Sequence, residues 1–435
     1  MNVLHVSYSD LNGGAARAAY RIHRSLIEQN KYKNISSKMR VVNKMSDDSS
    51  VYSDKSIFTS MLKIKIVTVL NKLSRLNFKP ATNILHSTAL IKTNFIKRIN
   101  SHFNDEKGIV NLHWLGDNTI SIEEINKIEQ PVVWTLHDQW PFCGAEHYVY
   151  SFSDKNNEDF DKRYIDGYES INRPHSERGF DINRNTWLRK YKSWNKKFHI
   201  VCPSNWMANC ARESYLMKNY PIHVIPYPID LNIWRPAPKL ESRKKFNFPS
   251  DALIILFGAV GGANDKRKGA DLLFDSLEIL FDQSDKSFLA KIQLVVFGQD
   301  HSDEISNKYK YPINFLGRIS NDETLRYLYA SADIFVMPSR QDNLPQTAIE
   351  SQACGTPVVG FANGGLLDIV EHEVTGYLAE PFDPLSLAFS IKNLLEDRNR
   401  LLEMSYASRA RSLKLWDQKV ISKKYINLYE EAFDR

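Results

Sequence analysis

The segment from residue 333 to residue 361 constrains the fold of this chain most. Its first apolar run, 333–337, is typical of a buried parallel strand, and a polar loop follows that run. Pro345 suits the first position of a helix, and Gly355 suits the position after its end. A second apolar run, 356–361, indicates the next buried strand. A strand, a helix and another strand in this order predict a parallel sheet covered by helices.

Two carboxylates lie in this segment, Asp342 in the loop and Glu350 on the expected helix. Open parallel sheets bind ligands at the carboxyl ends of their strands, where the Asp342 loop lies. The backbone N–H groups of Gln346 and Thr347 begin the helix, so with the helix dipole they would face a diphosphate. The segment therefore predicts a nucleotide-sugar site. The alternative is that Asp342 caps the helix and that Glu350 is a solvated helix carboxylate.

Length and composition limit the class of protein. A chain of 435 residues is too long for one ordinary core, so we expect two domains. Its 43% hydrophobic and 25% charged residues are typical of a soluble globular protein. No apolar stretch approaches the roughly 18 residues of a membrane span, and the first residues lack the pattern of a signal peptide. We therefore expect a cytoplasmic protein.

The cysteines are widely spaced and form no C-x-x-C pair. This spacing argues against a disulfide framework and against a cysteine zinc site. Cys202 and Cys354 border apolar runs, so we interpret them as small core residues.

Positive charge is concentrated near the start of the chain. Residues 1–100 hold 17 Lys and Arg against 5 Asp and Glu, whereas the whole chain has a net charge of +6. Residues 61–79 have the pattern of a basic amphipathic helix, which can lie peripherally on the inner face of the cell membrane. A surface helix packed on the core has the same pattern. No nucleic-acid-binding module accompanies the charge, so we expect no nucleic acid partner.

Apolar runs and helical patterns alternate in both halves of the chain, which predicts two Rossmann-like α/β domains. In the first half the expected strands are 2–8, 38–42, 109–114, 132–137, 200–203 and 223–225. In the second half they are 253–258, 292–298, 313–316, 333–337 and 356–361. The expected helices include 15–28, 205–217, a helix 322–330 with a capping box of Ser320 and Glu323, and a helix begun by Asp383 and Pro384.

The proline-rich segment 225–238 is the expected hinge between the domains. We place the N-terminal domain at 1–228, the C-terminal domain at 229–415 and a C-terminal helix at 416–435. Residues 145–195 fit this scheme poorly because they are polar, and we interpret them as a mobile loop over a cleft.

Two further segments combine glycine with a strand end. Gly13 and Gly14 follow the first strand and open a helix, so the backbone can approach a phosphate or a sugar there, although a simple tight turn has the same pattern. Arg267 and Lys268 follow a glycine-rich loop after the strand 253–258, and they could neutralise a diphosphate. A solvated run of charge is the alternative. The G-x-G-x-x-G pattern of dinucleotide sites is absent, which argues against a dehydrogenase.

His137 ends the strand 132–137 and stands beside Asp138. It could hydrogen-bond a sugar hydroxyl or stabilise developing charge. The alternative is a capping histidine or one linked to the core. No G-x-S-x-G elbow is present, which argues against a Ser-His-Asp hydrolase.

Together these motifs resemble the retaining glycosyltransferases of family 4, and in particular the colanic-acid-type branch of bacterial surface-polysaccharide transferases. The resemblance is carried by Gly13 to Ala16, Trp134 to Asp138, Arg267 to Gly269, Pro338 to Arg340, Asp342 to Glu350 and Ala353 to Val359. It spans nearly the whole chain and is stronger in the second half. It implies the GT-B fold, in which two Rossmann-like domains face each other across a cleft and a C-terminal helix crosses back to the first domain.

The resemblance also implies roles for single residues. Asp342 and His137 match positions that contact the donor sugar, and Glu350 matches the residue on the ribose hydroxyls. The catalytic residues implied are His137, Lys268 and Asp342. The donor-binding residues implied are Gly13, Gly14, Arg267, Lys268, Gly298, Arg318, Asn343, Leu344, Gln346, Thr347 and Glu350.

The chain departs from the family pattern at three places. Asp342 stands where the family has glutamate, so its reach is one methylene shorter. The pair Leu344-Pro345 replaces an aromatic residue and a glycine, and we interpret both changes as tuning for the donor. The family arginine has no counterpart at Ala259, and Arg267 is expected to replace it.

The reaction implied is transfer of a sugar, with anomeric retention, from a UDP- or GDP-sugar to a glycan or lipid-linked acceptor. Cations and a helix N-terminus would stabilise the leaving diphosphate, so no metal ion and no other cofactor is expected. The first alternative is a nucleotide-sugar epimerase or a phosphorylase of the same fold. Activity that requires an added acceptor would favour transfer over epimerisation. The second alternative is a non-catalytic nucleotide-sugar-binding partner subunit, which would bind the donor without turnover.

Overall fold

The computed structural model describes two compact units. Unit 1 comprises Met1–Pro226 and Ile421–Arg435, and unit 2 comprises Tyr227–Val420. The described residues are 1–29, 35–53, 78–79, 84–93, 95–103, 106–116, 119–149, 162–258, 265–300, 308–309 and 311–434. The predicted basic helix at 61–79 lies outside these ranges except for its last two residues.

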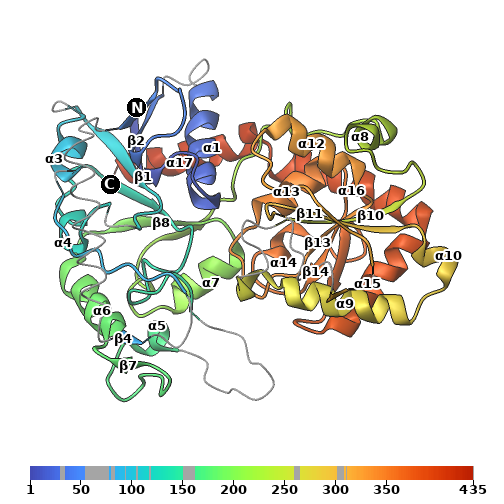
Figure 1. Cartoon of the computed structure of the whole chain (residues 1–435). Coiled ribbons are helices and arrows are strands. Elements are labelled where there is room, and N and C mark those ends of the chain that lie inside the picture. Colours follow the sequence, from blue (N-terminus) through green and yellow to red (C-terminus); the bar gives the residue numbers. More distant parts are fainter. Residues whose placement is uncertain are drawn as a thin grey trace. The chain divides into compact units, whose positions relative to one another are not determined.

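The core of unit 1 is a parallel sheet (Figure 1). Its strand order is β3-β2-β1-β5-β6-β8-β9. Strands that follow each other in the sequence are therefore joined by crossovers, as in Rossmann-like domains. The strands are β1 (Asn2–Ser9), β2 (Ser36–Asn43), β3 (Val51–Ser53), β5 (Gly108–Leu112), β6 (Val132–Thr135), β8 (Phe198–Cys202) and β9 (Ile222–Val224). A separate antiparallel pair is formed by β4 (Phe78–Lys79) and β7 (Arg178–Gly179).

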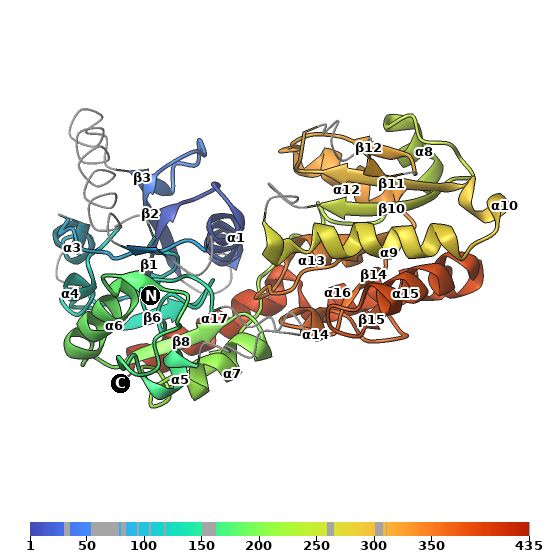
Figure 2. The same ribbon diagram turned by 60° about the horizontal axis from the view of Figure 1, so that its bottom comes forward.

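Helices cover both faces of this sheet (Figure 2). On one face, alternate strand residues such as Leu112, Trp134 and Ile200 join a large apolar core with the helices α3, α4, α6 and α7. On the other face, Ala19 of α1 packs against Met39. The helices are α1 (Gly14–Gln29), α3 (Phe95–Asn100), α4 (Ile122–Ile125), α5 (Arg163–Asp166), α6 (Ile182–Ser193), α7 (Asn205–Glu213) and α17 (Gln418–Phe433).

The last helix, α17, belongs to unit 1, although it follows unit 2 in the sequence. It lies on the same face as α1, where the Asn111 amide donates to the Tyr429 hydroxyl over 2.6 Å. Tyr425 and Tyr429 are both fully buried there. Because these two tyrosines lie one helical turn apart, they form one side of a helix, and that side packs against the sheet. The C-terminal helix thus returns to the first domain, as the resemblance implied.

Unit 2 is built in the same way around a six-stranded parallel sheet with the order β12-β11-β10-β13-β14-β15. The strands are β10 (Leu253–Gly258), β11 (Ile292–Phe297), β12 (Ile313–Phe315), β13 (Ile334–Met337), β14 (Val358–Phe361) and β15 (Gly376–Ala379). The helices are α8 (Lys239–Lys245), α9 (Ala270–Asp282), α10 (Lys286–Leu289), α12 (Asp322–Ser331), α13 (Gln346–Ala353), α14 (Leu366–Ile369), α15 (Pro384–Glu396) and α16 (Arg398–Leu415), with a 3-10 turn at Lys266–Lys268.

The two layers of helices in unit 2 have different partners. The helices α9 and α15 share an apolar core with one face of the sheet. On the other face, Tyr329 of α12 makes edge contacts with Phe297 and Phe335. Every strand run predicted for this half is present, and each differs from its prediction by at most two residues at an end. The strands β3 and β15, which lie at edges of the two sheets, were not predicted.

Two local predictions are wrong. The helix α12 is capped by Asn321, whose side chain accepts from the Thr324 N–H over 2.8 Å, so the capping box of Ser320 and Glu323 does not form. The interpretation of 145–195 as a loop over a cleft also fails for its described part. Tyr168 and Trp187 from this segment are buried in the large core of unit 1. Aromatic residues spaced along a polar segment can thus contribute to a core.

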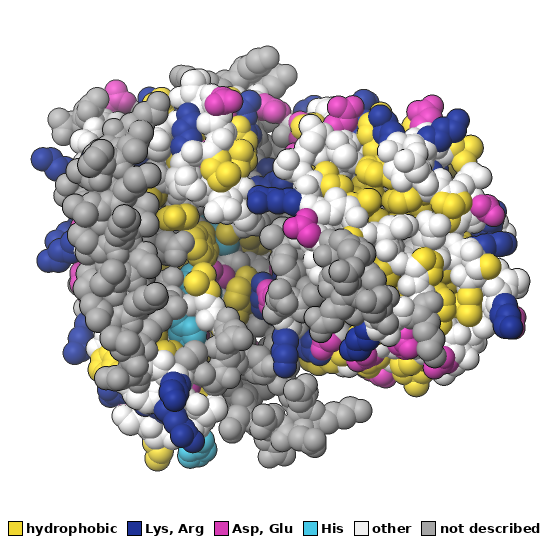
Figure 3. Space-filling view, in the orientation of Figure 1, with side chains coloured by type: hydrophobic (Ala, Val, Ile, Leu, Met, Phe, Trp, Pro, Cys, Tyr) yellow, Lys and Arg dark blue, Asp and Glu magenta, His cyan; other side chains and the backbone are white. Residues whose placement is uncertain are grey.

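The distribution of positive charge on the surface is relevant to the predicted contact with a membrane. On the face drawn in Figure 3, the Lys and Arg side chains of the described residues are spread over both units. Among the described helices, none is long and apolar enough to cross a membrane.

Candidate functional site

The carboxyl edge of the sheet in unit 2 holds a partly buried ion pair. Lys268 ends the 3-10 turn before α9, and Asp342 lies in the loop after β13. The Lys268 ammonium donates to the Asp342 Oδ2 over 2.5 Å. Burial raises the pKa of Asp342, but Lys268 and Arg267 outweigh that effect and hold it below its usual range. Asp342 is therefore ionised at neutral pH and orients a cation, and it does not cap α13.

Arg267 fastens the same two segments together. Its Nη1 donates to the Gln341 carbonyl over 3.2 Å, and its Nη2 donates to the Asp265 carboxylate over 3.0 Å. The Arg267 carbonyl accepts from the Arg340 N–H over 2.8 Å. Two adjacent cations thus stand at the carboxyl ends of β10 and β13, where an anionic ligand of an open parallel sheet binds.

Glycine allows this close approach of the two segments. Gly269 has a φ of +70°, and a Cβ built there would lie 1.9 Å from the Pro338 carbonyl oxygen. On the other side of the loop, the Gly365 N–H donates to the Asp342 carbonyl over 3.0 Å. A Cβ at Gly365 would lie 1.5 Å from the Asn343 carbonyl oxygen. The Asp342 loop is therefore held between two backbones that tolerate no side chain.

The helix α13 begins one residue later than predicted. Pro345 is its N-cap, with φ −65° and ψ 111°, so Gln346 takes the first helical position. The first turn of a helix carries N–H groups without intrahelical acceptors, and here those positions include Gln346 and Thr347. Asn343 and Leu344 are each 3% exposed, so their side chains hold the loop from inside the protein.

Glu350 is buried on α13 and is not the solvated carboxylate of the alternative interpretation. It is 6% exposed, and its Oε2 accepts from the Tyr329 hydroxyl over 3.1 Å. Tyr329 is fixed in turn by its edge contact with Phe335. A buried carboxylate with an oriented donor is costly to maintain for packing alone. This burial is the reason to retain Glu350 as a candidate binding residue.

Two weaker candidates lie at neighbouring strand ends. Gly298 follows β11 with a φ of +84°, and its N–H donates to the Gly317 carbonyl over 2.8 Å. Arg318 follows β12 and is exposed. Both lie at the carboxyl edge of the sheet in unit 2.

In unit 1, Gly13 and Gly14 lie where β1 leads into α1. Gly13 has a φ of +92°, and its carbonyl accepts the first intrahelical bond from the Arg17 N–H over 3.1 Å. A Cβ built at Gly13 meets no atom within 4 Å, so the space beside this backbone is open. Asp10 fixes the turn by accepting from the N–H groups of Met45 and Ser46. The helix N-terminus is thus presented on a rigid turn.

His137 lies two residues beyond β6 in a chain of buried histidines. Its Nε2 is 3.0 Å from the His113 Nδ1, and the His113 Nε2 is 2.9 Å from the His5 Nδ1. Burial lowers the pKa of His137 to about 4, although the nearby Asp138 opposes this effect. His137 is therefore neutral at pH 7. His137 is thus linked to His113, and a role as a cation at neutral pH does not fit.

Asp138, which we predicted only as the neighbour of His137, has a separate network. Its Oδ2 is 2.6 Å from the His147 Nδ1 and accepts from the Trp114 indole over 2.7 Å. The His147 Nε2 is 2.8 Å from the Ser87 hydroxyl. No spacing in the sequence points to these contacts, because they join residues from distant segments.

Sequence reasoning also missed Lys190 on α6. This lysine is fully buried, donates to the carbonyls of Trp140, Cys143 and Gly144, and lies 3.9 Å from the centre of the Trp140 ring. Burial lowers its pKa to about 7. Three carbonyl acceptors and an aromatic face are the usual partners of a structural buried ammonium.

Comparison with known proteins places these observations in context. Residues 238–411 match the family model of the glycosyl transferases group 1. A curated relative, the D-inositol 3-phosphate glycosyltransferase of Thermobispora bispora, is 29% identical over 237 residues, which are 52% of this chain and 54% of the relative. The chain spans about half the length of the curated relatives that it matches.

Two solved structures match nearly the whole chain. Sucrose-phosphate synthase from Thermosynechococcus elongatus has a TM-score of 0.66 at 17% identity, with 100% of this chain and 99% of that chain covered. Anabaena HepE in complex with UDP has a TM-score of 0.63 at 14% identity, with 99% and 100% covered. These likenesses show the fold. This chain therefore has the two-domain GT-B fold, and its residues 238–411 are similar to the glycosyl transferases group 1.

Proposed function

We propose that this chain is a retaining glycosyltransferase that moves a sugar from a UDP- or GDP-sugar to a glycan or lipid-linked acceptor in surface-polysaccharide biosynthesis. The observation that carries the proposal is the Lys268–Asp342 pair at the carboxyl edge of a group 1 glycosyl transferase domain. The UDP bound by HepE, which shares the fold, supports a nucleotide-sugar donor. The acceptor class rests on the motif resemblance.

The chemistry of the proposed reaction suits the cations of unit 2. Negative charge develops on the leaving diphosphate, and fixed positive groups lower the barrier by stabilising that charge. The Lys268 ammonium has three N–H donors, and one of them reaches Asp342. The other donors of Lys268, together with Arg267 and the N-terminus of α13, can bind phosphate oxygens. We expect these groups to act without a metal ion.

The carboxylates have separate proposed tasks. Asp342 orients Lys268, and its oxygens can also accept hydrogen bonds from hydroxyl groups of the donor sugar. Glu350, held by the Tyr329 hydroxyl, is proposed to accept from the ribose hydroxyls of the nucleotide. Both carboxylates are largely buried. Hydrogen bonds to them are therefore stronger than the same bonds would be in water.

In unit 1, the neutral state of His137 limits its proposed role. A neutral imidazole can form a hydrogen bond with a sugar hydroxyl, but it cannot neutralise the charge of a phosphate. Gly13 and Gly14 offer backbone N–H groups at the start of α1, next to open space. We propose these three residues as contacts for the sugar or for phosphate oxygens.

A two-step experiment tests the function. First, thermal unfolding is recorded with a panel of UDP- and GDP-sugars, because a ligand that binds only the folded state raises the unfolding temperature. The donor that stabilises most is then incubated with glycan and lipid-linked acceptors. NMR of the product reads the anomeric configuration of the new bond. Retention of configuration supports the proposal, and inversion would overturn it.

The same experiment separates the alternatives. Conversion of the donor into another nucleotide-sugar without acceptor would show an epimerase. Release of a sugar phosphate in the presence of inorganic phosphate would show a phosphorylase. Binding of the donor without turnover on any acceptor would show a non-catalytic partner subunit. No stabilisation by any UDP- or GDP-sugar would reject the donor class.

A further inference from the structure

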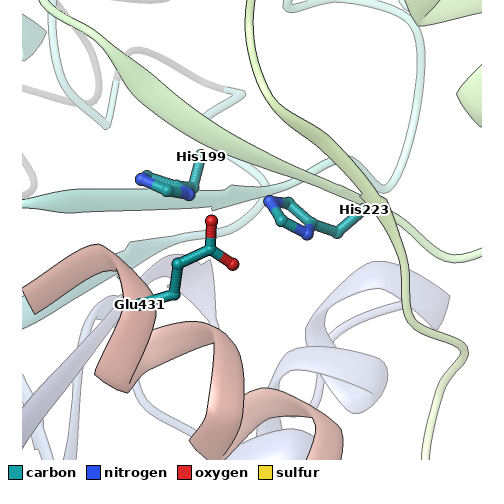
Figure 4. Close-up of side chains that lie close together, drawn as sticks. All are labelled: His199, His223 and Glu431. Carbon is teal, nitrogen blue, oxygen red and sulfur yellow. The ribbon is translucent and has the colours of Figure 1, made fainter. Parts of the chain in front are cut away.

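Three metal-binding side chains meet in unit 1, away from the residues discussed so far. His199 comes from β8, His223 from β9 and Glu431 from α17. One ligand atom from each residue lies within 4.8 Å of the other two. Figure 4 shows the Glu431 carboxylate reaching from the helix toward the two imidazole rings of the sheet. The rings are 5.7 Å apart between centres and tilted by only 21°.

The register of the sheet explains why these residues meet. Along β8, Phe198, Ile200 and Cys202 point into the large apolar core, so His199 faces the opposite side. On β9, His223 pairs with Val201 and therefore lies on the same side as His199. Both imidazoles therefore lie on the face of the sheet that is turned away from the large apolar core.

The helix α17 occupies that face. Two of its tyrosines are anchored on neighbouring strands, where Tyr429 bonds Asn111 and the Tyr425 hydroxyl is 3.4 Å from the Thr135 hydroxyl. Glu431 lies on the same helix, and its carboxylate reaches the two histidines at the edge formed by β8 and β9 (Figure 4). The position of each ligand is therefore set by packing that does not depend on a metal.

The ligand chemistry fits a transition metal ion. Two imidazoles and one carboxylate form a donor set used for Zn²⁺, with a fourth position left for water. Ligand atoms around a tetrahedral Zn²⁺ lie about 3.4 Å apart at the usual bond lengths of roughly 2.0–2.1 Å. The most distant pair of ligand atoms would have to approach by at most about 1.4 Å, which changes of side-chain torsion can supply. His199 is buried and the other two residues are half-buried, so the ligands are partly removed from water.

We propose that His199, His223 and Glu431 bind a divalent transition metal ion of the zinc class, and that this ion fastens α17 to the edge of the sheet in unit 1. The ion joins a helix from the end of the chain to strands that precede unit 2. Its effect is on the stability of unit 1, which makes it independent of the proposed reaction. The absence of a cysteine motif does not bear on this site, because none of its ligands is a cysteine.

The test uses the full chain after treatment with a chelator. Zn²⁺ is titrated by calorimetry, Co²⁺ binding is followed by its visible absorption, and thermal unfolding is recorded with and without Zn²⁺. We expect one high-affinity ion per chain and a higher unfolding temperature with Zn²⁺. Loss of an outer hydrogen-bond partner of a metal costs about 10- to 100-fold in affinity, so loss of a direct ligand should cost more than about 100-fold.

Two variants and a control decide the assignment. His223→Gln and Glu431→Gln remove a ligand while they preserve a polar side chain of similar size, so the fold is kept. His175→Ala removes an exposed histidine of the same unit and should leave Zn²⁺ affinity unchanged. Both ligand variants should lose the Co²⁺ absorption band and the thermal shift. Equal Zn²⁺ affinity in the wild type and in both ligand variants would overturn the proposal, as would no Zn²⁺ binding by the wild type.

Discussion

Lys268 and Asp342 form an ion pair of 2.5 Å that joins the turn before α9 to the loop after β13. The two residues are far apart in sequence, yet each follows a neighbouring strand of one parallel sheet. Because carboxyl ends of parallel strands meet at one edge, the sheet brings them together. Lysine and aspartate are 22% and 17% exposed, so the pair sits partly open to a ligand.

Lys268→Ala should weaken the binding of the nucleotide diphosphate. A hydrogen bond between charged groups contributes about 1.5–3 kcal/mol, which corresponds to a Kd raised roughly 10- to 100-fold. Calorimetry with UDP and GDP measures the change. The matched control is Lys291→Ala, which removes an exposed lysine just before β11, at the amino edge of the same sheet. Equal nucleotide affinity in both variants and in the wild type would remove Lys268 from the proposed site.

The sequence predicts this edge well because short-range patterns determine it. The apolar runs 253–258 and 333–337 locate β10 and β13, and each polar loop must follow its strand. The pairing of Lys268 with Asp342 could not be predicted, because it depends on the backbone contact of Gly269 with the carbonyl of Pro338. A contact of this kind has no counterpart in the periodicity of either segment.

Glu350→Gln should separate the charge of this residue from its packing. The amide oxygen of glutamine still accepts from the Tyr329 hydroxyl, so unfolding temperature should change little. The loss of negative charge should weaken the proposed bonds to ribose hydroxyls and raise the KM for the donor about tenfold. Glu350→Ala, which also leaves Tyr329 without its acceptor, should abolish measurable transfer. Wild-type kinetics in both variants would contradict the assignment.

The control for Glu350 is Tyr329→Phe. This change removes the hydroxyl donor but keeps the ring contacts with Phe297 and Phe335. If Glu350 acts only through the fold, Tyr329→Phe and Glu350→Gln should lower stability and activity together. If Glu350 contacts the donor, Glu350→Gln should raise KM more than Tyr329→Phe does.

The lowered pKa of His137 predicts how the free energy of unfolding depends on pH. Its pKa is about 4 in the folded protein, because burial disfavours the charged ring, against about 6.5 in an unfolded chain. The unfolded state therefore binds the proton first as the pH falls, so stability is full above pH 6.5 and declines toward pH 4. The full shift corresponds to on the order of 3 kcal/mol. Urea unfolding of the full chain at several pH values measures how the free energy of unfolding of unit 1 changes with pH.

The variants test which histidine is responsible. His137→Gln removes the group that titrates, so the decline between pH 6.5 and 4 should become shallower than in the wild type. His175→Ala changes an exposed histidine and should leave the slope unchanged. An unaltered slope in His137→Gln would show that other buried histidines, such as His113, carry the whole effect.

Unit 1 shows where sequence reasoning ends. The strands β1, β5, β6 and β8 follow from apolar runs, and α1 follows from its periodicity. The histidine chain from His5 to His137 and the metal-binding group at Glu431 depend on register across strands. Register is set by the packing of the whole sheet, and a one-residue shift would move each side chain to the other face.

Gly269→Ala should destabilise unit 2 and weaken nucleotide binding together. Its φ of +70° costs an alanine about 1–2 kcal/mol, and the new Cβ would also meet the Pro338 carbonyl oxygen at 1.9 Å. The matched control is Gly317→Ala, which has a similar φ of +64° but meets only the Asp300 side chain, at 3.2 Å. Thermal unfolding and UDP titration compare the two variants. Because the clash alone moves the loop that carries Asp342, only Gly269→Ala should lose nucleotide affinity, and equal losses in both variants would trace the effect to backbone strain.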